Sequence, residues 1–98
     1  MATLRIIRVR EFKSSLRDIK IEVNGREIGK VKNGETRDFN IGQGNQYIKA
    51  TLDVCSSNPV EVDVKGDELI SLHLSHKDGI ALINMIFFNN EYMKLEKV

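Results

Sequence analysis

The chain has 98 residues, of which 41% are hydrophobic and 30% are charged, and its formal net charge is +1. This length suits one domain, residues 1–98, and the charge balance excludes a disordered, strongly charged chain. Ile, Val and Thr supply 22 β-branched residues against 3 Ala, which favours sheets over a helical bundle. The single cysteine, Cys55, excludes an internal disulfide framework.

The near-neutral total conceals a basic N-terminal segment. Residues 1–20 contain six basic and two acidic side chains (+4), whereas residues 21–98 contain nine basic and twelve acidic ones (−3). A basic patch in this segment would suit an acidic partner, although lysine and arginine also protect edge strands from pairing with other chains. Exposed aromatic residues for base stacking are scarce, so nucleic acid is not the favoured partner. The expected patch consists of Arg5, Arg8, Arg10, Lys13 and Arg17.

Residues 3–10 form the first predicted strand, but its apolar side chains fall on both faces. Leu4 and Ile6 lie in one register, and Ile7 and Val9 lie in the other. We therefore expect a β-bulge at Ile6–Ile7, because a bulge shifts the register by one residue and returns both pairs to the core.

The middle of the chain alternates between apolar and polar residues with period two, which is typical of strands with one buried face. The alternating segments are residues 19–23, 48–54, 60–64 and 70–75. Phe39 and Ile41 mark a shorter strand, and Asn24-Gly25 is a strong hairpin signal. The pattern predicts a single all-β antiparallel sandwich of about seven or eight strands, either Ig-like or transthyretin-like.

The C-terminal part carries a surplus of apolar residues. Residues 80–88 are apolar on both faces, which fits a strand covered twice or a short buried helix; we favour a strand, because Asn89-Asn90 then closes a hairpin into residues 91–98. One face of this hairpin either buries against a second subunit or a protein partner, or is covered within the monomer. The expected interaction surface consists of Ile83, Met85, Phe87, Tyr92, Met93 and Leu95.

Residues 19–74 contain IKIEVNGREIGKVKNGETRDFNIGQGNQYIKATL and then SSNPVEVDVKGDELISLHL. This stretch resembles small bacterial β-sandwich modules of the PEGA and carboxypeptidase-regulatory-like kind. In such modules a strand ends in Val-Asn/Asp-Gly, and a short strand containing a Gly follows. The Pro-Glu-Gly-Ala motif is missing here, and the His or Tyr that often follows the late Gly is displaced to Tyr47. The resemblance implies a sandwich used for binding or spacing, with no catalytic residues.

The residues with chemical potential are few. His73 and His76 are three apart, so on one strand they face opposite sides and do not chelate one metal together. We expect Cys55 to be a small residue at a strand end. In the turn that follows, we expect the side chain of Ser57 or Asn58 to form a hydrogen bond with the backbone. The favoured function is a non-catalytic binding or protein-interaction module, without an assigned catalytic residue, metal or cofactor. The alternatives are a small enzyme or metal-binding protein that uses these residues, and a carbohydrate-binding module.

Targeting signals are not recognisable in this sequence. Arg5, Arg8 and Arg10 interrupt every apolar run near the N-terminus, so no signal peptide is predicted. No apolar run approaches the roughly 20 residues of a membrane-spanning helix. We therefore expect a cytoplasmic protein, or an extracellular one if the chain is part of a longer protein.

Overall fold

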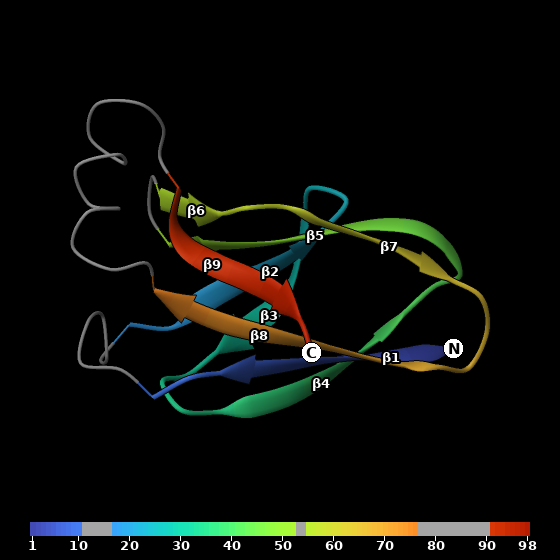
Figure 1. Ribbon diagram of the computed structural model, residues 1–98, viewed down its shortest axis with the longest axis horizontal. Coiled ribbons are helices and arrows are strands. Elements are labelled where there is room, and N and C mark those ends of the chain that lie inside the picture. The colour runs from blue at the N-terminus through green and yellow to red at the C-terminus, as the bar shows by residue number, and fades with distance from the viewer. Residues whose placement is uncertain (11–16, 53–54, 77–90) are drawn as a thin grey trace.

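The computed structural model describes residues 1–10, 17–52, 55–76 and 91–98. These ranges contain nine β-strands and no helix (Figure 1), which confirms the predicted all-β class. The strands are β1 (Ala2–Arg8), β2 (Ile19–Val23), β3 (Arg26–Val31), β4 (Thr36–Ile41), β5 (Gly44–Leu52), β6 (Cys55–Ser57), β7 (Val60–Val64), β8 (Leu69–His76) and β9 (Glu91–Lys97).

The strands form one sheet that curls back on itself. Its order is β3-β2-β5-β6-β9-β8-β1-β4, and β7 pairs with β5 beside this path. The two end strands, β3 and β4, are consecutive in the chain and are joined by the turn at residues 32–35. The two ends of the path therefore lie near each other, and the sheet is a nearly closed barrel (Figure 1).

Two strand pairs are parallel. β1 runs parallel to β8, with Thr3 opposite Leu69 and Arg8 opposite Leu74, and β6 runs parallel to β9. The expectation of a purely antiparallel sheet is wrong for these pairs. Sequence alternation shows which face of a strand is buried, but it does not show the direction of the neighbouring strand.

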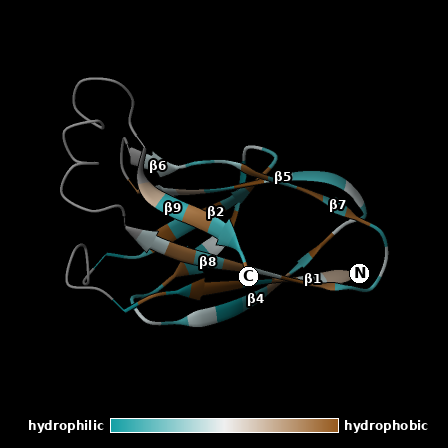
Figure 2. Cartoon of the chain, in the orientation of Figure 1, coloured by the Kyte–Doolittle hydropathy of each residue, from teal (hydrophilic) through white to brown (hydrophobic). Residues whose placement is uncertain are grey.

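The core fills the inside of the barrel, with polar and apolar residues alternating along the strands (Figure 2). In β7, for example, Val60, Val62 and Val64 are buried, whereas Glu61 and Asp63 are exposed. Burying one such aliphatic side chain contributes about 1.5–3 kcal/mol. The core residues are Ala2, Leu4, Ile6, Ile19, Ile21, Val31, Phe39, Ile41, Ile48, Ala50, Leu52, Val60, Val62, Val64, Leu72, Leu74, Met93 and Leu95.

The hairpin between β2 and β3 forms as the sequence predicts. Asn24 and Gly25 have φ values of 53° and 81°, and a type I′ turn needs positive φ at both of its central residues. The next turn is different, because only Gly34 takes a positive φ there, at 73°. Its backbone is closed by a hydrogen bond from the Glu35 amide to the Lys32 carbonyl, 2.9 Å long.

Strand β1 is straight, and the bulge predicted at Ile6–Ile7 is absent: its register with β4 and β8 is unbroken. The straight register turns Arg8 inward, and this side chain is only 3% exposed. Its guanidinium donates 2.8 Å hydrogen bonds to the carbonyls of Arg17 and Val31. These bonds help to compensate the desolvation of the buried guanidinium. Strand β1 can therefore run without a bulge that would turn Arg8 towards the solvent.

Strands β6 and β7 are separated by a corner at residues 57–59, which we call the β6–β7 corner. The Ser57 hydroxyl accepts a 2.9 Å bond from the Ala50 amide and donates a 2.9 Å bond to the Asn58 carbonyl. The Asn58 side chain bonds both the amide and the carbonyl of Leu95, at 3.0 and 2.9 Å. The predicted bonding to the turn backbone is confirmed for Ser57. Asn58 additionally replaces a main-chain rung between this corner and β9.

Residues 80–88 lie outside the described residues, so the choice between strand and helix there stays a prediction. Within the described ranges, no helix has the length and apolar character to span a membrane.

Candidate functional site

The barrel is interrupted between β3 and β4. These strands end the path of paired strands, and no backbone hydrogen bond joins them among the described residues beyond their turn. Each has one paired edge, with β2 or β1, and one edge without a ladder. We call the space between these two edges the β3–β4 seam. Unpaired strand edges present main-chain donors and acceptors that are able to bind another strand.

Near the turn, side chains close the seam in place of a ladder. Phe39 of β4 lies against β3 so closely that a Cβ at Gly29 would stand 2.5 Å from its Cε1 atom. The Arg37 guanidinium donates a 2.7 Å bond to the Lys30 carbonyl on β3 and sits 5.0 Å from the centre of the Phe39 ring. Gly29 is therefore required for this closure, which we call the Phe39 latch.

A β-bulge bends β3 beside the latch. Ile21 pairs with Gly29 and Glu22 pairs with Glu27, so Ile28 is an additional residue on β3. Bulges bend the strand that carries them and increase its twist. This bend falls between the closed end of the seam and the end that is open.

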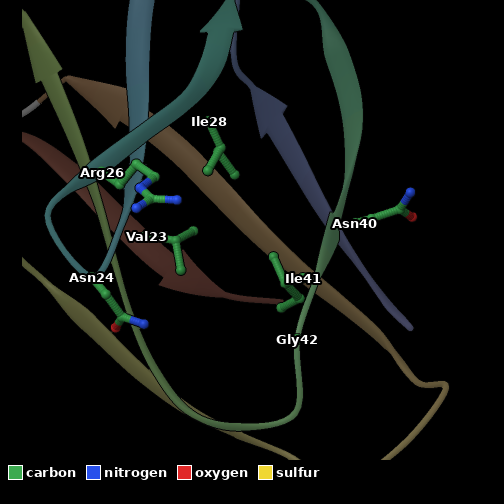
Figure 3. Close-up of a pocket in the computed structure, with 7 residues that line it drawn as sticks. All are labelled: Val23, Asn24, Arg26, Ile28, Asn40, Ile41 and Gly42. Carbon is green, nitrogen blue, oxygen red and sulfur yellow. The ribbon is translucent and has the colours of Figure 1, made fainter.

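The open end of the seam contains a pocket of about 390 Å³. Figure 3 shows Val23, Ile28 and Ile41 pointing into it, together with Arg26, whereas the Asn40 side chain points away. The pocket is therefore lined by both apolar and polar groups, and Arg26 carries the single formal charge among its lining residues. Its lining residues are Val23, Asn24, Arg26, Ile28, Asn40, Ile41 and Gly42.

A polar network holds two sides of this pocket in place. The Asn24 side-chain Nδ2 donates a 2.6 Å bond to Gln46 Oε1, and Asn24 Oδ1 accepts a 2.9 Å bond from the Tyr47 backbone amide. Gln46 in turn donates to the carbonyls of Gly42 and Gln43, both at 3.1 Å. The β2–β3 turn and the loop before β5 are thus fixed to each other, so this part of the pocket wall is formed in advance.

The cation at the pocket, Arg26, has no partner in the described part of the chain. Arg26 is exposed, and no hydrogen bond or ion pair of its guanidinium occurs among the described residues. Arg5 provides a contrast, because its guanidinium bonds both oxygens of Asp38, at 2.9 and 3.0 Å. The Arg5 hydrogen bond holds the pKa of the Asp38 carboxyl below its usual value. Arg26 thus offers an unneutralised charge to a bound molecule.

The basic residues of the predicted patch do not share one free surface. Arg5 is paired with Asp38, and Arg8 points into the barrel. Arg10 is exposed beside Gly34, and the Arg17 carbonyl accepts a bond from Arg8. Lys13 lies outside the described residues. The patch expected from the sequence therefore loses Arg8 to the interior, because β1 carries no bulge.

The predicted interaction surface falls largely outside the described residues. Ile83, Met85 and Phe87 belong to that part, as does the side chain of Tyr92. The two members that are described, Met93 and Leu95, are 0% and 2% exposed and belong to the core. Their position follows from the inward face of β9, which pairs with β8. These two side chains are therefore not available to a partner.

In the described part of the structure, the residues with potential for metal binding or nucleophilic chemistry, His73, His76 and Cys55, do not form a common site. His73 is half-buried on β8 and faces Glu96 across the β8–β9 pair. Cys55 begins β6 opposite Leu52, and the side chains of Cys55 and His76 lie outside the description. Among the described residues, no three His, Cys, Asp or Glu side chains are grouped as a metal site would require.

Sequence reasoning did not single out the residues of the seam. The only signals were a Gly inside a predicted strand, at Gly29, and the imperfect alternation of residues 26–31. A Gly within a strand often marks a bulge or a close backbone approach, and both occur here. Comparison of the chain with protein-family models, with curated proteins and with solved structures gave no significant match.

Proposed function

We propose that this protein is a non-catalytic protein-interaction module that binds its partner in the β3–β4 seam. The observation that carries the proposal is the combination of two strand edges that have no ladder among the described residues with a pocket at their open end. Partners that add a strand to a free edge gain affinity from main-chain hydrogen bonds and specificity from pockets for alternate side chains. The seam offers both kinds of contact.

The sheet order supports the same kind of module. The described strands belong to one sheet, in which β6 joins β3, β2, β5 and β7 on one side to β9, β8, β1 and β4 on the other. Two such halves that face each other across a core would make a sandwich, so we propose that the chain is an Ig-like sandwich related to the PEGA-type modules that its sequence resembles. In this assignment the seam is one of the two margins between the sheets.

The proposal is tested by selection of random octapeptides displayed on phage against the purified protein. We expect the protein to enrich a recurring set of sequences and Ile28→Trp to lose them, because the larger ring fills the pocket. Gly42→Trp is a second filling variant, since an added Cβ at Gly42 meets only the Gln46 amide nitrogen, at 3.7 Å. Leu69→Trp is the control, because Leu69 is 53% exposed on β8 and does not line this pocket.

Circular dichroism and thermal melting establish which variants are folded before binding is compared. Selection that yields no recurring sequence would refute the proposed function. The same conclusion follows if folded pocket-filling variants bind the enriched peptides as tightly as the original protein does.

A further inference from the structure

The ligand of the seam can be described from the geometry of its open end. We infer that the seam binds a short, extended acidic peptide, with an apolar side chain in the pocket and an Asp or Glu two residues away against Arg26. This inference rests on the proposed function and specifies the chemistry of the partner.

The missing pairing between β3 and β4 favours an inserted strand. Among the described residues neither strand has a ladder on its seam side, so both edges present main-chain donors and acceptors towards the seam. Neighbouring strands lie about 4.8 Å apart, so a chain that bonds to both edges would hold β3 and β4 about 9.5 Å apart.

The length of the open part limits the ligand to a few residues. The Phe39 latch blocks the seam at Gly29, and the pocket begins at Arg26. At about 3.3 Å per residue, the distance along β3 between these positions is about 10 Å. The inserted segment therefore has room for three or four extended residues, and the rest of the partner would lie outside the seam.

The side chains of Arg26 and Ile28 determine the pattern of the ligand. Both point into the pocket from the same strand (Figure 3). In an extended ligand, residues two apart likewise share a face. An apolar residue seated against Val23, Ile28 and Ile41 therefore places the residue two positions away, rather than the adjacent one, towards Arg26.

The charge of the pocket selects an acidic residue at that position. Arg26 carries the only formal charge among the lining residues. Glu27 is the nearest acidic residue in sequence, but its Oε1 lies 3.9 Å from Lys20 Nζ. Glu27 therefore forms an ion pair with Lys20. A guanidinium binds a carboxylate through two parallel hydrogen bonds, which is a stronger and more directional contact than a neutral one.

The inference is tested by reversing the charge at Arg26. Octapeptide selection against the original protein should enrich an apolar residue and an Asp or Glu separated by one position. Selection against Arg26→Glu should enrich Lys or Arg at the acidic position. Arg26 is exposed and has no partner within the described ranges, so this substitution should leave the fold intact, which thermal melting checks.

Fluorescence anisotropy then gives the size of the effect. Two fluorescein-labelled octapeptides are compared that differ only by Glu or Lys at the selected position. We expect the affinity for the Glu peptide to be at least tenfold lower in Arg26→Glu than in the original protein. The affinity for the Lys peptide should be higher in Arg26→Glu than in the original protein. Lys94→Glu is the matched control: it changes the net charge equally, but it lies on β9, which is adjacent to neither β3 nor β4.

The outcomes separate the inference from the proposed function. Recurring peptides that are lost in Ile28→Trp but are unchanged in Arg26→Glu would overturn the acidic preference and leave the binding module standing. If the enriched peptides bind folded Ile28→Trp and folded Arg26→Glu as tightly as the original protein, both the acidic preference and the proposed binding function are overturned. Concentration-dependent dimers that Ile28→Trp abolishes, with no peptide enriched, would assign the seam to a second copy of the chain and overturn the peptide inference.

Discussion

The β6–β7 corner and the β3–β4 seam are both places where main-chain pairing between strands is interrupted, and they are completed differently. At the corner, Ser57 and Asn58 supply the hydrogen bonds that a ladder would have made. At the seam, only the end near the turn is closed, by Phe39 and Arg37. The comparison shows that side chains can stand in for a missing ladder. Where none does so, as at the open end of the seam, the described strand edges have no ladder, and we propose that a partner binds there.

The largest effect is expected at the corner. Asn58→Ala removes both hydrogen bonds to the Leu95 backbone, and partly buried main-chain groups left without partners should destabilise the protein by about 2–3 kcal/mol. Ser57→Ala, which removes the acceptor of the Ala50 amide, should cost about 1–3 kcal/mol. Urea unfolding measures both. The control is Asn45→Ala at an exposed position on β5; if it costs as much as Asn58→Ala, the side-chain rung has no special role.

A smaller effect is expected at the latch. Gly29→Ala places a methyl group 2.5 Å from Phe39 Cε1, so the ring must move away, at a cost of about 1–2 kcal/mol. Amide hydrogen exchange along β3 and β4 should become faster as the seam opens further. Gly42→Ala is the matched control, because its added Cβ meets only Gln46 at 3.7 Å and Gly42 has no positive φ. Equal exchange in the two variants would show that Phe39 does not hold the seam.

The smallest effect concerns the exposed pair Arg5–Asp38, which joins β1 to the outer strand β4. The pKa of Asp38 is lowered from its usual 3.8, chiefly by the Arg5 hydrogen bond. This pair therefore contributes stability above that pH, and the contribution is lost as the pH falls through the lowered pKa.

Arg5→Gln should raise the pKa of Asp38 towards 3.8, which NMR titration of the carboxyl measures. Its stability difference from the original protein should be larger at pH 5 than at pH 2. Lys94→Gln removes the same charge from a separate surface pair, with Glu96, and should leave the Asp38 titration unchanged. An Asp38 pKa that does not respond to Arg5→Gln would show that the pair is not formed in solution.

Much of the fold could be predicted from the sequence, because a buried face imposes period-two alternation on a strand. Segments such as residues 60–64 follow this rule, and the turn at Asn24-Gly25 has the positive φ values that its residues favour. The parallel pairing of β1 with β8 could not be predicted, because alternation does not encode the direction of a neighbour. The sequence predicts an exposed Arg8, which is wrong for a related reason. Its buried position depends on carbonyls of Arg17 and Val31, which only the folded chain brings near.

Less of the candidate site was predictable. The expected basic patch and apolar hairpin followed from local composition, whereas the seam arises from pairing that is missing between two strands. The bulge at Ile28 and the contact of Phe39 with Gly29 are tertiary features, and a single Gly in residues 26–31 is a weak sign of them. Arg26 looked like any other surface cation in the sequence. Its significance comes from the absence of a described partner and from its place at the pocket.

The central position of β1 has a consequence for how the chain folds during synthesis. β1 lies between β4 and β8, and its register with β8 joins Thr3 to Leu69. When a ribosome has made β1 to β4, the strand has only one of its two neighbours, and its other edge stays exposed until β8 emerges. Contacts so distant in sequence slow folding, so this edge is where premature association of nascent chains is expected to begin.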